Sequence, residues 1–357
     1  MSTRQQILFW LISLLIFGAV LYLLRPVLLP FVAAMAVAYL LDPTADRLVR
    51  WNFSRNAATW ILTVAFFATI ILVVLLLAPL LYSQIIGFID RLPEYVQSAR
   101  SWLRPIVERL IERIPILGDP SAIWQNTANF AAGWTSWLGV GVAGMWSRGL
   151  ALFNLLSLLL ITPVVAFYLL RDWDRFVAVI DSLLPRQHAD TIREQARRVD
   201  AVLAAFVRGQ ALVALADGLV YGLGLSLIGL EFGLVIGLTA GLLSFVPYLG
   251  ALLGSFTAII VALLQWGLDP LRLALVAGVF VVGQLLENAV WQPRLLGKRV
   301  GLHPVWVIFG VLAGASLFGF VGVLLAVPVA AAIGVLIRFG LDRYRESRIY
   351  RGPDVVA

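Results

Sequence analysis

Long apolar runs separated by short charged stretches dominate this chain. An α-helix needs about 20 mainly apolar residues to cross the roughly 30 Å hydrocarbon core of a bilayer. The runs are too long and too uniformly apolar for barrel strands, which alternate in shorter pieces. The pattern therefore predicts an all-α polytopic membrane protein with about six full spans, over Ile7–Leu24, Val27–Leu41, Ala57–Tyr82, Leu150–Leu170, Ala211–Ile228 and Leu271–Ala289. Pro26 and Asp42-Pro43 flank the short second run, and we expect that run to end there as the return arm of a tight hairpin.

Two further apolar runs, Gly233–Trp266 and Val305–Ile337, are too long for one perpendicular crossing. The first is interrupted by Pro247-Tyr248-Leu249-Gly250 and the second by Gly319-Phe320-Val321-Gly322. We interpret each run as a re-entrant hairpin with its tip at the interruption. Each arm would then span about 24 Å of helix.

The distribution of arginine sets the topology. The stretch 171–208 is rich in arginine, which places it in the cytoplasm together with the N-terminus and the basic tail. If Gly233–Trp266 crossed the membrane once, Arg294 would lie outside, whereas a hairpin keeps it inside. A hairpin over Val305–Ile337 likewise keeps the basic groups on both of its flanks in the cytoplasm.

The two hairpin regions are also related to each other. Gly209-Gln210 corresponds to Gly283-Gln284, and Gly250 to Gly322, at a spacing of 74 and 72 residues respectively. Each unit is one span followed by one hairpin, and the two units enter the membrane from opposite sides. Such an inverted repeat is typical of secondary transporters.

A hairpin tip inside a bilayer leaves backbone groups that lipid cannot satisfy, so these groups must face protein, water or a ligand. We therefore expect the tip residues to contribute to a solute site, whereas Gly237, Gly241 and Gly310 are expected only to pack helices. The tip candidates are Pro247, Tyr248, Gly250, Gly319, Phe320 and Gly322.

Polar side chains recur at helical spacing within two of the spans. Gln210, Ala214, Asp217 and Tyr221 share one face of the first, and Gln284, Glu287, Asn288 and Trp291 share one face of the second. Asp217 and Glu287 are candidate proton or cation carriers. The alternatives are a structural interhelical hydrogen bond and, for Glu287, a place among the lipid headgroups.

Composition excludes several classes of function. Of the 357 residues 61% are hydrophobic and 13% charged, and the mean hydropathy is +0.94. The chain has no cysteine and only two histidines, His188 and His303, which excludes thiol chemistry and makes us expect neither a metal site nor another bound cofactor. The net charge of +7 fits loops that meet anionic lipid, and we expect no nucleic-acid partner. Neither a P-loop nor the residues of a catalytic centre are evident, so we expect no enzyme.

The segment Ser83–Arg148 is expected to be extracytoplasmic and to contain two amphipathic helices, either as a packing element or as a subunit interface. These observations divide the chain into an N-terminal scaffold (1–82), this segment (83–149), a fourth span with a basic helix (150–208), a transport core (209–337) and a basic tail (338–357).

Several motifs in combination resemble the AI-2E transporter family, also known as PerM-like permeases. The resemblance rests on Arg208-Gly209-Gln210, Phe245-Val246-Pro247-Tyr248-Leu249-Gly250, Glu287-Asn288, Gln292-Pro293-Arg294-Leu295-Leu296-Gly297-Lys298, Gly301-Leu302-His303-Pro304 and 317–328. It implies a bacterial inner-membrane exporter of small polar solutes such as autoinducer-2. It also implies a homo-oligomer, a pentamer, and an elevator-like movement of the hairpin domain.

The sequence is compatible with three functions. The leading hypothesis is a secondary transporter of small polar solutes, with coupling to protons or sodium. A sodium/proton antiporter, in which Asp217 or Glu287 exchanges the ion, is the alternative. A membrane scaffold without transport activity, built around Ser83–Arg148, is the third.

Overall fold

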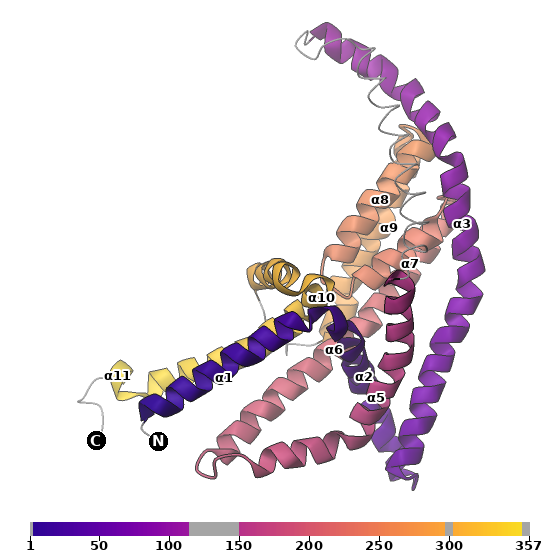
Figure 1. Ribbon diagram of the computed structural model, residues 1–357. Coiled ribbons are helices and arrows are strands. Elements are labelled where there is room, and N and C mark those ends of the chain that lie inside the picture. The colour runs from indigo at the N-terminus through magenta and orange to yellow at the C-terminus, as the bar shows by residue number, and fades with distance from the viewer. Residues whose placement is uncertain (1–2, 114–149, 297–302, 352–357) are drawn as a thin grey trace. The chain divides into compact units, whose positions relative to one another are not determined.

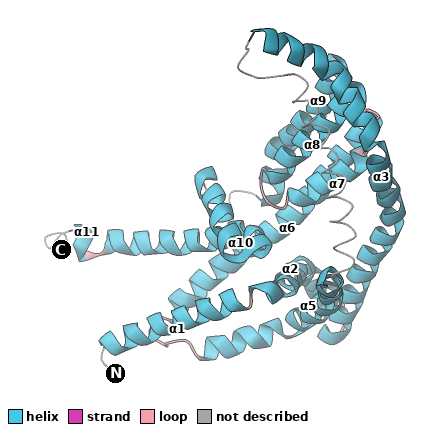
Figure 2. Cartoon of the chain, turned by 45° about the horizontal axis from the view of Figure 1, so that its top comes forward, coloured by secondary structure: helices cyan, strands magenta, loops and turns pink. Residues whose placement is uncertain are grey.

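A computed structural model describes residues 3–113, 150–296 and 303–351 of the chain (Figure 1). Within these ranges the regular elements are helices, and no strand occurs there (Figure 2). The elements are α1 (Thr3–Leu23), a 3-10 turn (Arg25–Val27), α2 (Leu28–Arg50), α3 (Arg55–Arg113), α5 (Leu150–Ser182), α6 (Ala189–Leu227), α7 (Gly233–Leu243), α8 (Leu249–Trp266), α9 (Pro270–Leu286), a π-helix (Glu287–Leu296), α10 (Pro304–Glu346) and α11 (Arg348–Arg351).

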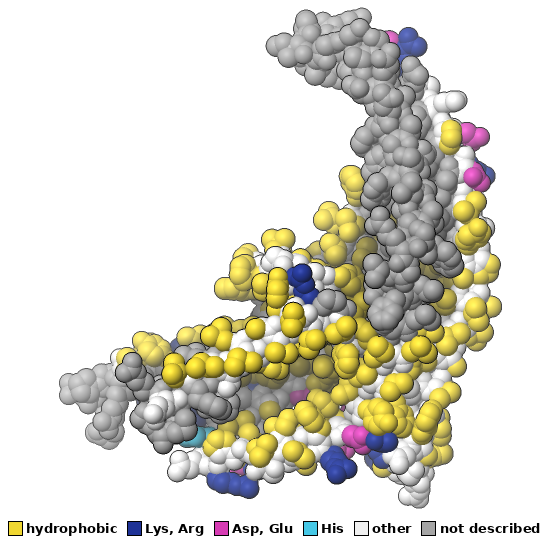
Figure 3. Space-filling view, in the orientation of Figure 1, with side chains coloured by type: hydrophobic (Ala, Val, Ile, Leu, Met, Phe, Trp, Pro, Cys, Tyr) yellow, Lys and Arg dark blue, Asp and Glu magenta, His cyan; other side chains and the backbone are white. Residues whose placement is uncertain are grey.

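Six of the helices in the described ranges are long and apolar enough to cross a bilayer. Hydrophobic side chains cover most of the described surface in the view of Figure 3, which is the surface that lipid requires. The chain is therefore an all-α polytopic membrane protein, as the hydrophobic pattern predicted. The six helices extend over Leu28–Arg50, Arg55–Gln84, Ala189–Leu227, Leu249–Trp266, Pro270–Leu295 and Val305–Glu346. Four of them overlap predicted spans, whereas Leu249–Trp266 and Val305–Glu346 belong to the two runs that we interpreted as hairpins.

The chain divides into two compact units. One unit comprises Met1–Phe67, Leu156–Gly209 and Leu296–Ala357, and the other comprises Ala68–Leu155 and Gln210–Leu295. We call the second the hairpin unit. The boundary in α6 falls between Gly209 and Gln210, within the motif that sequence analysis singled out.

The core of the hairpin unit lies where α6, α7, α8 and α9 pack together. Tyr221 and Leu225 of α6 are buried against Ala240 of α7, Ala258 of α8 and Phe280 of α9. The Tyr221 and Phe280 rings stack with their centroids 4.7 Å apart. This packing holds the polar face of α6 at a fixed distance from α9.

Two pairs of glycines bring α6 and α7 into backbone contact. A Cβ atom at Gly237 would overlap the backbone of Gly222, and one at Gly241 would overlap the backbone of Gly218. Because the glycines are four residues apart on each helix, the pattern is the small-xxx-small interface of membrane helices. The prediction that Gly237 and Gly241 pack helices is confirmed.

The chain turns back on itself at both predicted tips. In the hairpin unit, α7 ends at Leu243 and α8 begins at Leu249, with Tyr248 in the left-handed conformation at φ 69°. In the other unit, α10 is broken at Gly319 (φ 60°, ψ −137°), and its two arms come into backbone contact at Gly314 and Gly322.

The predicted end of the second span at Asp42-Pro43 is wrong, because α2 continues through Pro43 to Arg50. Proline has no N–H and leaves the carbonyl four residues earlier without its helical donor. That carbonyl belongs to Tyr39, and it accepts a hydrogen bond of 2.8 Å from Nε of Arg208. A distant arginine thus replaces the missing donor, and the helix continues.

Helix α3 also continues beyond its apolar part. It runs for 59 residues, through Pro79, Pro93 and Pro105, so Ser83 lies within a continuous helix. At 1.5 Å per residue it is about 88 Å long, far longer than a bilayer is thick. The rest of the predicted extracytoplasmic segment, 114–149, lies outside the described residues.

Candidate functional site

A buried polar face on α6 forms one side of the candidate site. Gln210 is 2% exposed, and Asp217 and Tyr221 are fully buried. These are three of the four residues predicted to share a face at helical spacing. Burial of a carboxylate and a phenol among apolar helices costs free energy unless another group or ligand compensates them.

Glu287 lies opposite, where α9 gives way to the π-helix, and it is 2% exposed. Both of its carboxylate oxygens accept hydrogen bonds from side-chain amides. Nε2 of Gln284 donates to Oε2 over 2.9 Å, and Nε2 of Gln292 donates to Oε1 over 3.0 Å. Both oxygens of this buried carboxylate therefore have a hydrogen-bond partner.

The structure brings Asp217, Tyr221 and Glu287 together, and the Glu287 carboxylate lies within electrostatic reach of both Asp217 and Tyr221. Among the described residues, the Asp217 carboxylate oxygens and the Tyr221 hydroxyl make no hydrogen bond of good geometry, and the Ser244 side chain is the polar group within reach of Asp217. We call these three residues the carboxylate cluster. Its two acids differ in kind, because Glu287 is satisfied by amides and Asp217 is not.

The end of α7 closes the site on the side of the hairpin tip. Nε2 of Gln210 donates to the carbonyl of Ser244, the first residue after α7. The Ser244 hydroxyl donates to the carbonyl of Ala240 over 3.0 Å. Gly250 packs so closely on Ala240 and Ser244 that a Cβ atom there would overlap both. A tip carbonyl, free at the end of its helix, is thereby satisfied by a side chain of α6.

Several predicted site residues do not join the carboxylate cluster. Pro247 is partly buried in the turn and Tyr248 is half exposed, while Asn288 is exposed on the π-helix. Gly319, Phe320 and Gly322 belong to the other unit, where Phe320 is 62% exposed and Gly322 is buried.

Sequence analysis missed Gln292 and Ser244 as partners in the site. Gln292 follows Glu287 by five residues, a spacing that an α-helix places on different faces. The π-helix from Glu287 to Leu296 hydrogen-bonds over five residues and brings the two side chains together. Pro293, which cannot donate within a helix, is the sequence signal that accompanies this irregular turn.

A second polar contact ties the opposite end of the hairpin unit to α3. Glu231, in the loop before α7, accepts from both Arg91 and Tyr95 of α3. The Gln265 side chain of α8 accepts from the Glu231 backbone over 2.9 Å and donates to the Gly229 carbonyl over 3.1 Å. Burial, together with the hydrogen bond to Glu231, raises the pKa of Tyr95 above its ordinary value. The neutral phenol therefore remains the donor over the whole physiological range.

The described residues hold no group of three or more histidine, cysteine or acidic side chains arranged for a metal ion. The carboxylate cluster places two acids of unequal environment at close range, an arrangement in which neighbouring carboxyl groups differ in their affinity for a proton.

The spanning helices and the buried acids Asp217 and Glu287 define a polytopic membrane protein that carries carboxyl groups in its interior. The family model described as AI-2E family transporter matches residues 11–342, and the chain belongs to this family of membrane transporters. The resemblance seen in the sequence motifs is thereby confirmed.

Curated relatives extend over nearly the full chain. This chain is 27% identical over 329 residues to "Putative permease PerM" of Escherichia coli (strain K12), and the match covers 92% of this chain and 91% of the relative. It is 24% identical over 339 residues to "Putative transport protein YueF" of Bacillus subtilis (strain 168), covering 92% and 90%. It is 29% identical over 314 residues to "Putative transport protein sll0063" of Synechocystis sp., covering 84% and 74%.

Proposed function

We propose that this transporter is a secondary exporter of small polar solutes, such as the hydroxylated signal autoinducer-2, from the cytoplasm of a bacterium. It acts in the inner membrane with both termini in the cytoplasm. The observation that carries the proposal is the Asp217 carboxylate, which is fully buried beside Glu287 and forms no ion pair among the described residues. Two buried acids at close range favour the uptake of one positive charge, which gives the protein a means of coupling.

In this proposal the two hairpins re-enter the bilayer from opposite sides. The two sequence repeats, each one span followed by one hairpin, then form an inverted repeat. The turns at Tyr248 and Gly319 support it, because a chain reversal within an apolar run exposes peptide groups that a polar solute can bind. The hydrogen bond from Gln210 to the Ser244 carbonyl links the tip of the first hairpin to the helix that bears Asp217. Movement of that tip would therefore be sensed at the carboxylate cluster.

Proteoliposomes loaded with autoinducer-2 test the coupling. We expect release to depend on an imposed proton or sodium gradient, and Asp217→Asn to remove at least about nine-tenths of the gradient-dependent rate. Asp90→Asn, at an exposed carboxylate of α3, is the matched control and is expected to retain the rate. Gradient-dependent release by Asp217→Asn at the control rate would exclude this role for the carboxylate cluster.

Cation/proton antiport is the second candidate, and it is favoured by the same pair of acids. Antiport requires ion exchange in vesicles that contain no organic solute. A pH-sensitive dye inside the proteoliposomes reports this directly: a sodium-driven pH change in empty vesicles, abolished by Asp217→Asn, supports antiport. Gradient-dependent release of solute without that change supports solute export.

The topology can be tested because the chain has no native cysteine. Leu268 and Arg294 are both exposed, and each can be replaced by a single cysteine. Leu268 lies before α9, and Arg294 lies in the π-helix that follows it. We expect a membrane-impermeant maleimide to label position 268 from outside intact cells and position 294 only after permeabilisation. Equal labelling of both from one side would contradict the hairpin topology.

The oligomer is proposed to be a pentamer, by resemblance to the family. Native mass spectrometry of the detergent-solubilised protein gives the subunit number directly.

A further inference from the structure

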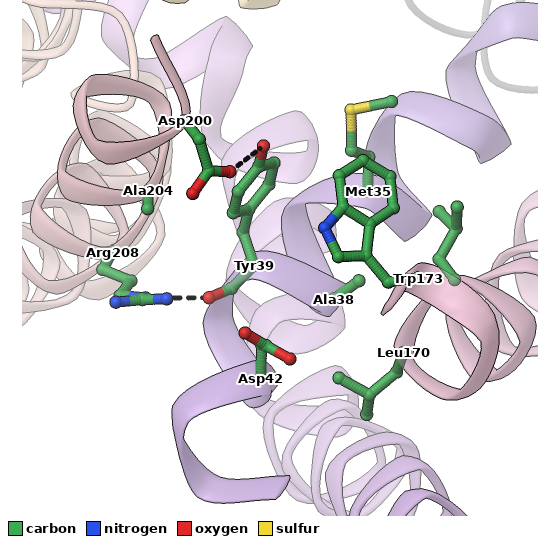
Figure 4. A pocket seen from close by; sticks show the side chains of 10 residues that line it. Met35, Ala38, Tyr39, Asp42, Leu170, Trp173, Asp200, Ala204 and Arg208 are labelled. Atoms are coloured by element: carbon green, nitrogen blue, oxygen red, sulfur yellow. Dashed lines mark hydrogen bonds between the residues drawn. The ribbon is translucent and has the colours of Figure 1, made fainter. Parts of the chain in front are cut away.

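A cavity of about 70 Å³ lies between α2, α5 and α6, in the unit that does not contain the carboxylate cluster (Figure 4). Tyr39 and Asp42 of α2, Trp173 of α5, and Asp200 and Arg208 of α6 provide its polar and aromatic lining. A cavity measured in this way needs about 10–15 Å³ to hold one water molecule, so this one has room for a group of a few heavy atoms. Solute transport as proposed above does not use it.

The cavity lies where α2 changes from apolar to charged residues. Met35 and Ala38 line its apolar part, and Asp42 is the first charged residue of the helix. In a membrane helix this change marks the level of the lipid headgroups. The cavity is therefore accessible to polar groups of lipids as well as to small solutes from the aqueous phase.

Among the residues that line the cavity, acidic groups outnumber basic ones. Asp42 is paired with Arg55 over 2.9 Å, and Arg55 also binds Asp46 over 2.6 Å, so this group of three retains a net negative charge. Within the described part of the chain, Asp200 accepts a hydrogen bond from a neutral donor, the Tyr39 hydroxyl at 3.0 Å, and forms no ion pair. Arg208 follows Asp200 by eight residues of helix, about 12 Å, so it is too far along the axis for a close ion pair.

Arg208 is held by a different contact. Its Nε donates to the Tyr39 carbonyl, which Pro43 leaves without a helical donor. One residue, Tyr39, thus holds Arg208 with its backbone and Asp200 with its hydroxyl, and Figure 4 shows the two contacts at opposite ends of the residue. This arrangement keeps the arginine at one end of the cavity and leaves the acid at the other.

Two aromatic rings also line the cavity, Tyr39 beside Asp200 and Trp173 on the other side of Tyr39 (Figure 4). The Tyr39 and Trp173 rings meet edge to face, with centroids 6.5 Å apart and planes at 61°. The face of a tryptophan or tyrosine ring attracts a cation, most strongly for tryptophan. An unneutralised carboxylate beside such rings is the chemistry that recognises an ammonium group.

We propose that this cavity binds an alkylammonium group, with Asp200 as the charge partner and Trp173 and Tyr39 as the aromatic walls. Its size admits the terminal ammonium and one or two adjoining carbons. The same group occurs on free ethanolamine and on the headgroup of phosphatidylethanolamine, and the proposal is the recognition of this shared chemistry.

Two binding experiments on the full-length protein in detergent test the proposal and distinguish the sources. Isothermal titration calorimetry with ethanolamine measures free amine, and native mass spectrometry with added phosphatidylethanolamine or phosphatidylglycerol measures bound lipid. We expect Asp200→Asn to weaken ammonium binding by about fivefold, the size of a partly exposed ion pair, and Trp173→Leu by about two- to fivefold. Asp174→Asn, an exposed neighbour that does not line the cavity, is the control and is expected to bind as the wild type does.

Each possible result either supports or overturns the ammonium site. Ethanolamine binding that is lost in Asp200→Asn supports a free amine, and selective retention of phosphatidylethanolamine that is lost in Asp200→Asn supports the lipid. Binding of neither, or equal binding by the wild type and Asp200→Asn, overturns the proposal. Preferential binding of phosphatidylglycerol that depends on Arg208 instead identifies an anion site and overturns it as well. Size-exclusion profiles show that the variants are folded, and Tyr39→Phe, which removes only the hydroxyl, provides a second variant. Both measurements are made without a gradient, so failure of the transport proposal leaves them unaffected.

Discussion

The close contact between α6 and α7 predicts a sharp difference between two glycine substitutions. Gly237 and Gly278 both lie inside helices of the hairpin unit, in α7 and α9. A Cβ atom at Gly237 would overlap the backbone of Gly222 and Tyr221, whereas one at Gly278 would meet nothing within 4 Å. Backbone atoms cannot rotate away as a side chain can, so the two helices must separate in Gly237→Ala.

The magnitude follows by comparing the two variants. Replacing glycine by alanine inside a helix stabilises by about 0.5–1 kcal/mol, and this gain is common to both. Overpacking costs about 1–3 kcal/mol, and it applies to Gly237→Ala alone. We therefore expect Gly237→Ala to be about 1–3 kcal/mol less stable than Gly278→Ala, which itself equals or exceeds the wild type.

Thermal unfolding of the purified protein in detergent measures the difference. At about 2–4 °C per kcal/mol for a domain of this size, the apparent Tm of Gly237→Ala should be at least about 2 °C below that of Gly278→Ala. Gly222→Ala is a further control at the same interface, because its Cβ would meet the movable Leu234 side chain at 3.3 Å. If Gly237→Ala were as stable as Gly278→Ala, the close backbone contact would be refuted.

Three further predictions concern other contacts. Pro43→Ala restores the helical N–H donor that Arg208 replaces at the Tyr39 carbonyl, so Arg208→Gln should lower the free energy of unfolding less in the Pro43→Ala background than in the wild type. A double-mutant cycle should give a coupling energy of about 0.5–1.5 kcal/mol between the two substitutions. Additive effects would show that Pro43 and Arg208 act independently. The hydrogen bonds from Arg193 hold the pKa of Asp181 below its usual value, so this acid stabilises the fold above its unfolded-state pKa of about 3.9, and the stabilisation is lost as the pH falls through the lower folded-state value. The difference in Tm between the wild type and Asp181→Asn should accordingly be constant above about pH 5 and disappear in stronger acid, and a difference that grows on acidification would contradict the assignment. Finally, Glu231→Gln should increase amide hydrogen exchange in the loop before α7 several-fold, because the carboxylate accepts from two side chains of α3; unchanged exchange would show that this contact does not restrain the loop.

The sequence was sufficient to predict the class of fold and the face of α6 that carries Asp217. Both depend on periodicity within a single helix, and hydrophobic burial in lipid makes that periodicity strong. The tips of both hairpins also fell where Pro247 and Gly319 interrupt apolar runs, because these residue types permit the backbone angles that a tight turn requires.

Features that depend on distant partners could not be predicted in this way. The continuation of α2 through Pro43 requires a donor from Arg208, which is far away in the sequence. The pairing of Gln292 with Glu287 requires a π-helical turn, whereas the prediction assumed α-helical spacing. The cavity that we propose to bind an ammonium group combines residues of three separate helices, so its lining depends on contacts between residues far apart in the sequence.

Helix α6 also limits how this part of the chain can change in length. From Gln210, which holds the Ser244 carbonyl, to Asp217 is seven residues, close to two helical turns. Insertion or deletion of one residue in that interval would rotate everything after it by about 100°, turning Asp217 toward lipid and removing Gly218 and Gly222 from α7. The exposed side chains in this interval, Leu212 and Leu215, are free to vary, whereas the buried Val213 and the number of residues are fixed. Viable length changes must come as whole turns or fall in the loops.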